Sequence, residues 1–286
     1  ISLFLSDAVA LRGFAEKYPL HPLSVEAKLR EGLSLQFAAL NGDAANEARR
    51  NQLVGELRSD TKIDVRRRFE VVAWSRQVAI RRMTLSSRAE RLREQEAVTR
   101  ALISEFPQVP DGYESLLAIA SGDVPAKART MAMEVLNQSP EEHVKQRARV
   151  LIERLSLIGR SLEEIARSAG AGDLVKETSG KLTILYSWSS LTPRFLEWAS
   201  RMASREPGVM LVGMCVDKDA QNGRRLVADS RTPGLHLFSD TPGSKNLLKA
   251  IVVSSANQIY ICDAAGKIVD IQGGTGLMQK LATLKQ

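Results

Sequence analysis

The chain has 286 residues, of which 44% are hydrophobic and 26% charged, a composition that excludes a disordered or fibrous protein. Its length suffices for two ordinary domains. The net charge of +7 is spread along the sequence and only 5% of the residues are aromatic, so no nucleic-acid partner is expected. No apolar run approaches the ~20 residues that span a bilayer, and no transmembrane segment is predicted.

The first residues, ISLFLSDAVALRGFAEKYP, lack an initiator methionine and the basic start and small-residue cleavage site of a signal peptide. We expect a chain whose upstream segment has been removed. Because that segment could have held a targeting signal, these residues leave the localisation unknown.

Helical periodicity extends from Leu3 to about Arg167. The stretch DVRRRFEVVAWSRQVAIRRM predicts one buried stripe, made of Val65, Phe69, Val72, Ala79 and Ile80. The stretch EEHVKQRARVLIERLSLIG predicts another, made of Val144, Ala148, Leu151, Leu155 and Ile158. Ser139 and Pro140 are expected to begin this second helix, and Gly159 to end it.

Two segments of this half are similar to each other. FAEKYPLHP at 14–22 and LISEFPQVP at 102–110 share an aromatic residue and two prolines. A helix that ends at Tyr-Pro or Phe-Pro and leads through a short link to a new helix is typical of stacked helical hairpins. Because this segment occurs in only two copies, a simple helical bundle remains the alternative to stacked hairpins.

After Gly180 the pattern changes to short β-branched runs, KLTILYSW, VMLVGMCVD, NQIYICD and KIVDIQ, which predict strands. A helix from Pro193 to about Arg205 separates the first two runs, which predicts a parallel, right-handed crossover. DAAG predicts a hairpin turn, and GLMQKLATLKQ a final helix. The expected fold class is therefore α+β with two domains, an all-helical one at 1–165 and an α/β one at 166–286.

The residues of the second half resemble a known superfamily. GKLTILYSWSSLTPRF resembles the GK-(apolar)-FWATWCxxC segment of secreted or membrane-anchored thiol–disulfide oxidoreductases (TlpA/ResA-like and AhpC/TSA types) of the thioredoxin-like superfamily. GVMLVGMCVDKDAQNG and NQIYICDAAGKIVDIQGG are similar to later blocks of the same proteins, in the same order, so the resemblance covers roughly the last 130 residues. It implies a thioredoxin-like fold, thiol–disulfide exchange, and a place in the cell envelope or periplasm.

The departures from this pattern fall on the chemistry. Aligned from Gly180, the two cysteine positions hold Thr192 and Phe195, so TPRF replaces CxxC. Neither side chain can act as a thiolate or resolve a mixed disulfide. The cis-proline position holds Asn257, and we expect a trans peptide before it, because a non-proline cis bond costs about 3–4 kcal/mol. No catalytic residue is assigned; the degenerate active-site positions are Trp188, Thr192, Pro193, Phe195 and Asn257.

The cysteines of the chain, Cys215 and Cys262, lie in the second and third predicted strands, with the first strand expected between them. A lateral separation of about 9–10 Å exceeds the ~7 Å Cα limit of a disulfide, so both are expected to be reduced and buried. Thr192 is expected to cap the following helix, with Pro193 at its first position. Four residues of that helix are expected to pack on the sheet: Phe195, Trp198, Ala199 and Met202.

No metal or cofactor is assigned. The histidines His21, His143 and His236 lie far apart, without metal-ligand spacing. Asp217 and Asp219 are interpreted as ordinary residues of the turn after the second strand, and IQGGTG as a turn rather than a phosphate loop.

Two functions stay open. The first is a non-enzymatic binding or scaffolding protein with a protein or peptide partner. Its degenerate site would offer Trp188 and Phe195 as apolar anchors and the Asn257 loop as a source of backbone hydrogen bonds, unless Phe195 only fills the core. The alternative is a thiol–disulfide oxidoreductase or peroxidase-like enzyme that works by an atypical route or with cysteines from a partner.

Overall fold

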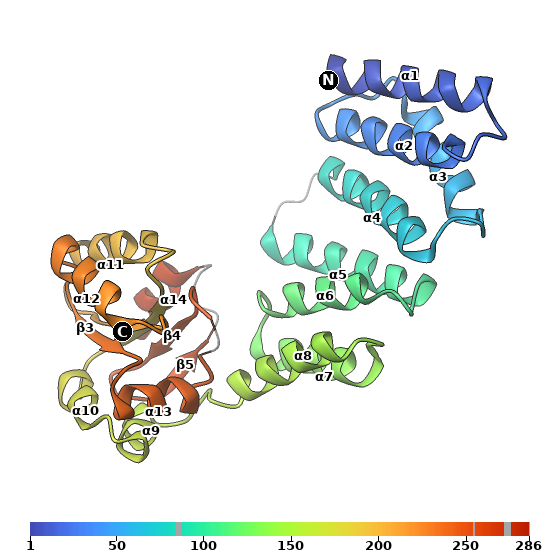
Figure 1. Cartoon of the computed structure of the whole chain (residues 1–286). Helices are drawn as coiled ribbons and strands as arrows, with labels where there is room; N and C mark the ends of the chain where they lie inside the picture. Colours follow the sequence, from blue (N-terminus) through green and yellow to red (C-terminus); the bar gives the residue numbers. More distant parts are fainter. Residues whose placement is uncertain (84–86, 254, 272–275, 286) are drawn as a thin grey trace. The chain divides into compact units, whose positions relative to one another are not determined.

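The structure is a computed structural model that describes residues 1–83, 87–253, 255–271 and 276–285. The chain divides into two compact units, Ile1–Ala148 and Arg149–Gln286, coloured blue to green and green to red in Figure 1. The first unit is helical and the second combines helices with one sheet, so the predicted fold class is confirmed. The division falls within α8 (Glu142–Leu155). The domain boundary predicted at 165/166 stays a prediction.

The helices of the first unit stack in chain order (Figure 1). Its complete helices are α1 (Ser2–Lys17), α2 (Ser24–Leu40), α3 (Glu47–Ser59), α4 (Val65–Arg82), α5 (Arg88–Glu105), α6 (Pro110–Ala120) and α7 (Pro125–Gln138). Helix α2 packs on α1, α3 and α4, and each later helix through α7 packs on the one before it. This neighbour-to-neighbour packing is typical of stacked helical arrays.

The two similar segments of this unit end their helices in the same way. Tyr18 follows α1 with φ −129° and ψ 60°, and Phe106 follows α5 with φ −130° and ψ 60°. Each donates its N–H to the carbonyl four residues earlier, at 2.9 Å and 2.8 Å. Both residues precede a proline, whose ring excludes the helical conformation from the residue before it. The shared sequence pattern therefore specifies a shared helix end.

The core of the first unit includes small clusters between neighbouring helices. One contains Leu29, Leu53, Leu57, Ile63 and Val71, and another contains Phe69, Val72, Leu102, Phe106 and Val109. The stripe predicted for α4 is partly wrong, because Ala79 is exposed and Val78 is fully buried in its place. The buried face of α4 thus follows Val71 and Val78, seven residues apart, which is two helical turns.

The carboxylate of Glu31 is buried in this unit. The side chain of Glu31 has no exposed surface and accepts hydrogen bonds from Arg12 at 2.9 Å and from Arg49 at 2.8 Å. Burial raises the pKa of Glu31, but the hydrogen bonds and charges of Arg49 and Arg12 outweigh burial, and the pKa lies below its ordinary value. This triad joins α1, α2 and α3.

The second unit contains a five-stranded mixed sheet with the strand order β3-β2-β1-β4-β5. Its strands are β1 (Thr183–Trp188), β2 (Met210–Cys215), β3 (Leu235–Phe238), β4 (Ile259–Cys262) and β5 (Ile268–Asp270). Strands β1, β2 and β3 are parallel, β4 is antiparallel to β1, and β5 is antiparallel to β4. The four predicted strands are present, and β3 is an additional strand between the second and third of them, where no strand was predicted.

Helices cover both faces of this sheet (Figure 1). They are α9 (Leu162–Ala169), α10 (Gly172–Thr178), α11 (Arg194–Arg205), α12 (Ala220–Ser230), α13 (Pro242–Ala250) and α14 (Leu277–Leu284). One face presents Ile184, Tyr186 and Trp188 of β1 to a core shared with α11, α12 and α14. On the other face, the Tyr260 hydroxyl donates to the Ile251 carbonyl at the end of α13 (2.8 Å). None of the described helices is long and apolar enough to cross a bilayer.

Candidate functional site

The positions that were predicted to form a degenerate active site lie at one edge of the sheet of the second unit. Trp188 ends β1, and the loop 189–193 leads into α11. Asn257 precedes β4 and donates its N–H to the Ser187 carbonyl at 2.9 Å. The carboxyl end of β1 and the start of β4 are neighbours because these strands are antiparallel. Trp188 and Asn257 therefore lie at the same end of β1.

Trp188 is a core residue at this edge, and the expectation of an apolar anchor there is wrong. Its side chain has no exposed surface and packs edge-on against His236, with ring centres 6.4 Å apart. The reason is the alternation of β1, which directs Trp188 to the same covered face as Ile184 and Tyr186. A partner at the surface would not reach it.

Thr192 does not cap α11 through its side chain. The helix begins at Arg194, Pro193 precedes it with φ −65° and ψ −15°, and no side-chain cap is present. The Thr192 hydroxyl instead accepts the Ser189 N–H at 3.3 Å and lies 3.1 Å from the Ser189 hydroxyl. The N–H groups of Phe195 and Leu196, in the first turn of α11, donate to the Thr192 and Pro193 carbonyls. The loop is therefore closed on itself.

The backbone beside Asn257 is also used inside the molecule. The peptide before Asn257 is trans, as expected, and Asn257 has a left-handed φ of 75°. The buried Ser187 hydroxyl accepts the Gln258 N–H at 2.8 Å and donates to the Ser255 carbonyl at 2.8 Å. Since the Asn257 N–H is bonded to β1 as well, three polar backbone groups of this loop already have partners inside the molecule: the Ser255 carbonyl and the N–H groups of Asn257 and Gln258.

Phe195 is half-buried and packs against Trp198 of the same helix, with ring centres 5.8 Å apart. Trp198 in turn meets Tyr186 edge-on at 5.5 Å. The predicted packing of α11 on the sheet is confirmed, because Ala199 and Met202 are buried and both aromatic rings contact the same core. At this edge the exposed apolar surface comes chiefly from Leu191, which is 90% exposed.

The two cysteines are buried and free, as expected, but their predicted separation is wrong. Cys215 pairs with Trp188 and Cys262 with Thr183, so the cysteines lie at opposite ends of β1 and on opposite faces of the sheet. Five residues along a strand add about 16 Å to the lateral spacing. The estimate of 9–10 Å counted only the lateral spacing.

The environments of both thiols disfavour deprotonation to the reactive thiolate. Burial raises the pKa of Cys215 to about 11 and that of Cys262 to about 12. The Cys215 thiol lies 3.6 Å from a carboxylate oxygen of Asp217, and a neighbouring negative charge also disfavours a thiolate. Neither thiol has the exposed, electropositive surroundings of a nucleophile.

The remaining polar candidates have structural roles. Asp217 accepts the Ser190 N–H at 2.8 Å, and Asp219 caps α12 by accepting the Gln221 N–H at 2.9 Å. Burial lowers the pKa of His236, whose Nε2 lies 3.1 Å from the Thr232 carbonyl. No group of three potential metal ligands occurs among the residues that the structure describes. The turn predicted for IQGGTG lies largely at 272–275, outside the described residues.

The sheet has three parallel strands followed by an antiparallel hairpin, with helices on both faces. The sequence predicted the parallel pair β1 and β2 and the hairpin of β4 and β5, and β3 completes the arrangement. The second unit has a thioredoxin-like fold. No protein-family model matches the chain, and no curated protein matches it in sequence. Several solved structures resemble it.

A secreted disulfide oxidoreductase of Mycobacterium tuberculosis is 19% identical over 46% of this chain and 98% of its own, with a TM-score of 0.33. The thioredoxin domain of a thiol-disulfide oxidoreductase from Bacteroides vulgatus is 14% identical over 38% and 82%, with a TM-score of 0.34. A thioredoxin-like protein from Bacteroides caccae is 10% identical over 89% and 94%, with a TM-score of 0.31. Similarity at this level determines no activity, and the fold follows from the strand order and pairing.

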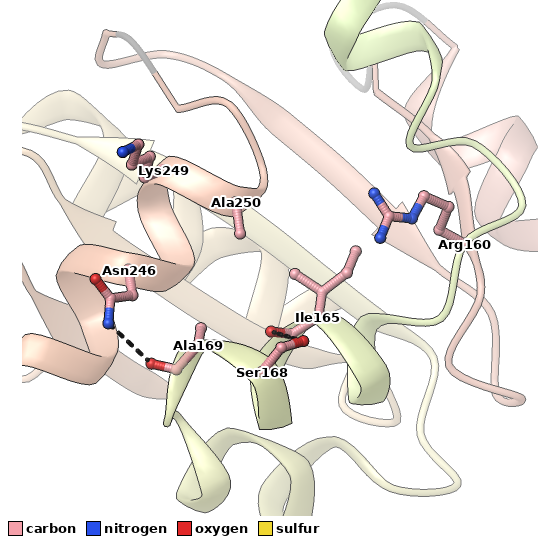
Figure 2. A pocket seen from close by; sticks show the side chains of 7 residues that line it. All are labelled: Arg160, Ile165, Ser168, Ala169, Asn246, Lys249 and Ala250. Atoms are coloured by element: carbon pink, nitrogen blue, oxygen red, sulfur yellow. Dashed lines mark hydrogen bonds between the residues drawn. The ribbon is translucent and has the colours of Figure 1, made fainter.

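A shallow pocket of about 470 Å³ lies between α9 and α13 of this thioredoxin-like unit (Figure 2). The Asn246 amide donates to the Ala169 carbonyl at 3.5 Å, and the Ser168 hydroxyl donates to the Glu164 carbonyl. Arg160 and Lys249 lie on different sides of the pocket in Figure 2. Its neutral polar groups are thus bonded within the protein, and its two cations do not converge on one point.

The first unit has a larger opening, which we call the α4–α6 groove. It has a volume of about 650 Å³ and is lined by Phe69, Glu70, Ala73, Trp74, Gln77, Ile80, Arg81, Leu92, Gln95, Val98, Thr99, Leu102, Asp111, Ser115, Ala118 and Ile119. Sequence reasoning missed this groove. The available signal was Trp74, a large aromatic residue that lies off the apolar stripe predicted for its helix.

Proposed function

We propose that this protein is a non-redox thioredoxin-like protein that binds or scaffolds a protein partner. The observation that carries the proposal is the state of the cysteines. Thr192 and Phe195 occupy the positions of the active-site pair, and the thiols that exist are buried on opposite faces of the sheet.

Thiol–disulfide exchange requires an accessible thiolate and a second thiol close enough to resolve the mixed disulfide. Burial raises the pKa of both thiols here, and they lie at opposite ends of β1. The proposal therefore assigns the thioredoxin-like unit a structural or binding role without electron transfer. From its resemblance to secreted and membrane-anchored proteins, we propose the cell envelope as its location.

The closed state of the degenerate site supports a partner site elsewhere in the chain. Trp188 is buried, Thr192 is bonded to Ser189, and the Asn257 N–H is bonded to Ser187. These groups would have to leave internal contacts before they could bind a peptide. The helical unit, in contrast, has an open groove lined by an aromatic side chain. We propose that the partner binds there.

The test is reduction of insulin disulfides by the full chain with dithiothreitol as the electron donor. A Cys215→Ala, Cys262→Ala double variant, confirmed as folded by circular dichroism, is the matched control, because it removes both cysteines of the chain. We expect equal rates for the parent and the double variant. A parent rate clearly above that of the folded double variant would contradict the proposal and support the atypical enzyme instead.

A further inference from the structure

The α4–α6 groove has the length of a short helix. Its α4 lining recurs once per turn, from Glu70 through Trp74 and Gln77 to Arg81. Eleven residues of helix extend about 16 Å, or three turns. The α5 lining recurs in the same way, from Leu92 to Leu102. Two helices therefore line the groove along its length.

The walls of the groove offer side chains but no backbone partners. All its lining residues belong to α-helices, whose backbone N–H and C=O groups are bonded within the helices. An extended peptide would bury unpaired backbone groups here, which is unfavourable. A helix satisfies its own backbone groups and presents only side chains, so the groove favours a helical occupant.

The groove has an apolar part, to which Ala73, Trp74, Val98, Ala118 and Ile119 contribute. The Trp74 ring also contacts the exposed Phe37 ring, with centres 5.3 Å apart, and Phe37 stacks on Phe4 at 5.5 Å. This aromatic row extends the apolar surface from the groove across α2 to α1. Tryptophan is among the residues that contribute most binding energy at interfaces, so the occupant needs an apolar stripe.

The charged residues at the two ends of the groove determine which charge the occupant should carry there. Arg81 is exposed and forms no ion pair with the described residues. At the opposite end, Glu70 lies 3.5 Å from Arg67, and Asp111 lies 3.1 Å from Arg66. The acidic end is therefore already balanced, whereas the Arg81 end favours a negatively charged side chain on the occupant.

We propose that the α4–α6 groove binds an amphipathic, acidic helix of about three turns from another protein. Its apolar stripe packs on Trp74 and Val98, and one of its carboxylates lies beside Arg81. This inference rests on the proposed function, since it specifies the partner of a binding protein. It commits to a helix rather than to an extended peptide or a second copy of the chain.

The test is a selection of peptides from a displayed library of random helical 14-residue sequences on the full chain. Selected peptides are then synthesised, labelled and titrated by fluorescence anisotropy. We expect enriched sequences with apolar residues at i, i+3 or i+4 and i+7, and an acidic residue near one end. Absence of enrichment, or enrichment of basic or extended sequences, would overturn the proposal.

Two exposed groove residues provide the variants. Ala118→Glu is expected to weaken binding about tenfold or more, because it places a carboxylate against the apolar stripe. Arg81→Glu is expected to weaken binding about fivefold, and a peptide with Lys in place of its terminal acid should recover that loss. The matched controls are Ala101→Glu and Arg129→Glu, exposed positions of the same unit outside the groove, which should leave affinity unchanged.

Other outcomes of the binding, sedimentation and insulin experiments would contradict one of the two proposals. Selected peptides that bind Ala118→Glu as tightly as the parent overturn the proposal, provided that circular dichroism shows both proteins folded. A parent dimer in sedimentation that Ala118→Glu dissociates also overturns it, because a second copy then fills the groove. Insulin turnover without a change in peptide binding contradicts only the proposed function. Equal insulin reduction by the parent and the double variant, with no peptide whose binding depends on the groove, contradicts this inference and the groove as the partner site but leaves the non-redox role standing.

Discussion

Ser187 and Gln258 hold the start of β4 against the end of β1. The Gln258 N–H donates to the Ser187 hydroxyl at 2.8 Å, and the Ser187 N–H donates to the Gln258 carbonyl at 2.8 Å. The same hydroxyl donates to the Ser255 carbonyl at 2.8 Å. Ser187 has no exposed surface, so water cannot replace these bonds. One side chain thus organises the loop that precedes β4.

Ser187→Ala is expected to destabilise the second unit by about 1–3 kcal/mol, because it leaves the Gln258 N–H and the Ser255 carbonyl without their partner. Urea denaturation followed by circular dichroism measures this loss. Ser190→Ala, in the neighbouring loop, is the control and should change stability by less than about 0.5 kcal/mol. Equal effects of the two variants would show that the Ser187 bonds do not hold the loop.

Glu31→Gln is expected to destabilise the helical unit by about 3 kcal/mol, the lower end for a broken buried ion pair, since Arg12 and Arg49 retain some contact with water. Unfolding in urea measures the change. Glu47→Gln is the matched control, because the Glu47 side chain is 48% exposed and its loss should cost less than about 1 kcal/mol. A control effect as large as that of Glu31→Gln would contradict the prediction.

The triad of Glu31, Arg12 and Arg49 also predicts how stability depends on pH. The pKa of Glu31 is lowered in the folded chain, since its bonds to Arg49 and Arg12 outweigh the effect of burial. The stabilisation from this group is therefore complete above the ordinary pKa of 4.5 and is lost as pH falls through the lowered folded value. The parent and Glu31→Gln should converge in stability under acid. A difference that stays constant with pH would contradict this.

Native thiol labelling tests the environment of Cys215 and Cys262. Neither should react with a maleimide at neutral pH, because burial raises their pKa values to about 11 and about 12. Both should react once the chain is unfolded in urea. Mass spectrometry of the native, air-oxidised protein should find no intramolecular disulfide. A disulfide between them would be incompatible with the strand register.

Separate folding of the two halves is a further prediction, with its boundary at 165/166. Fragments that begin at Arg149 and at Ala166 can be compared for stability. The Gly159 N–H donates to the Ile268 carbonyl at 2.7 Å, and the Leu162 N–H donates to the Gly266 carbonyl at 2.8 Å. We expect the longer fragment to be the more stable, because it keeps these bonds. Failure of both fragments to fold would contradict a two-domain division.

Much of the second unit was predictable from its sequence. The β-branched runs indicated β1, β2, β4 and β5, because such residues suit a pleated surface with two covered faces. The segment LHLF of β3 gave a weaker signal, since it is short and contains His236. The burial of Trp188 could also have been predicted, because Trp188 lies on the same face of the strand as Ile184 and Tyr186.

Other features of the site depend on contacts that local sequence patterns do not specify. Thr192 and Pro193 have the sequence of a helix start, but the nearby Ser189 takes the threonine hydroxyl. The left-handed backbone of Asn257 depends on its bond to β1, which lies about seventy residues earlier. The α4–α6 groove requires the spacing of three helices, which no single stretch of sequence encodes. Local patterns therefore gave the elements but not the surfaces between them.

The stacking of helices in chain order has a consequence for how the first unit loses its structure. Each helix relies mainly on its neighbours, and some of the core is divided into clusters between adjacent helices. Cooperativity in such an array is limited to nearest neighbours, so its ends can open while its middle stays closed. Amide protons of α1 would then exchange with solvent well before those of α5 and α6. Binding at the groove would slow exchange in the middle helices first, and the protection would fade with distance along the array.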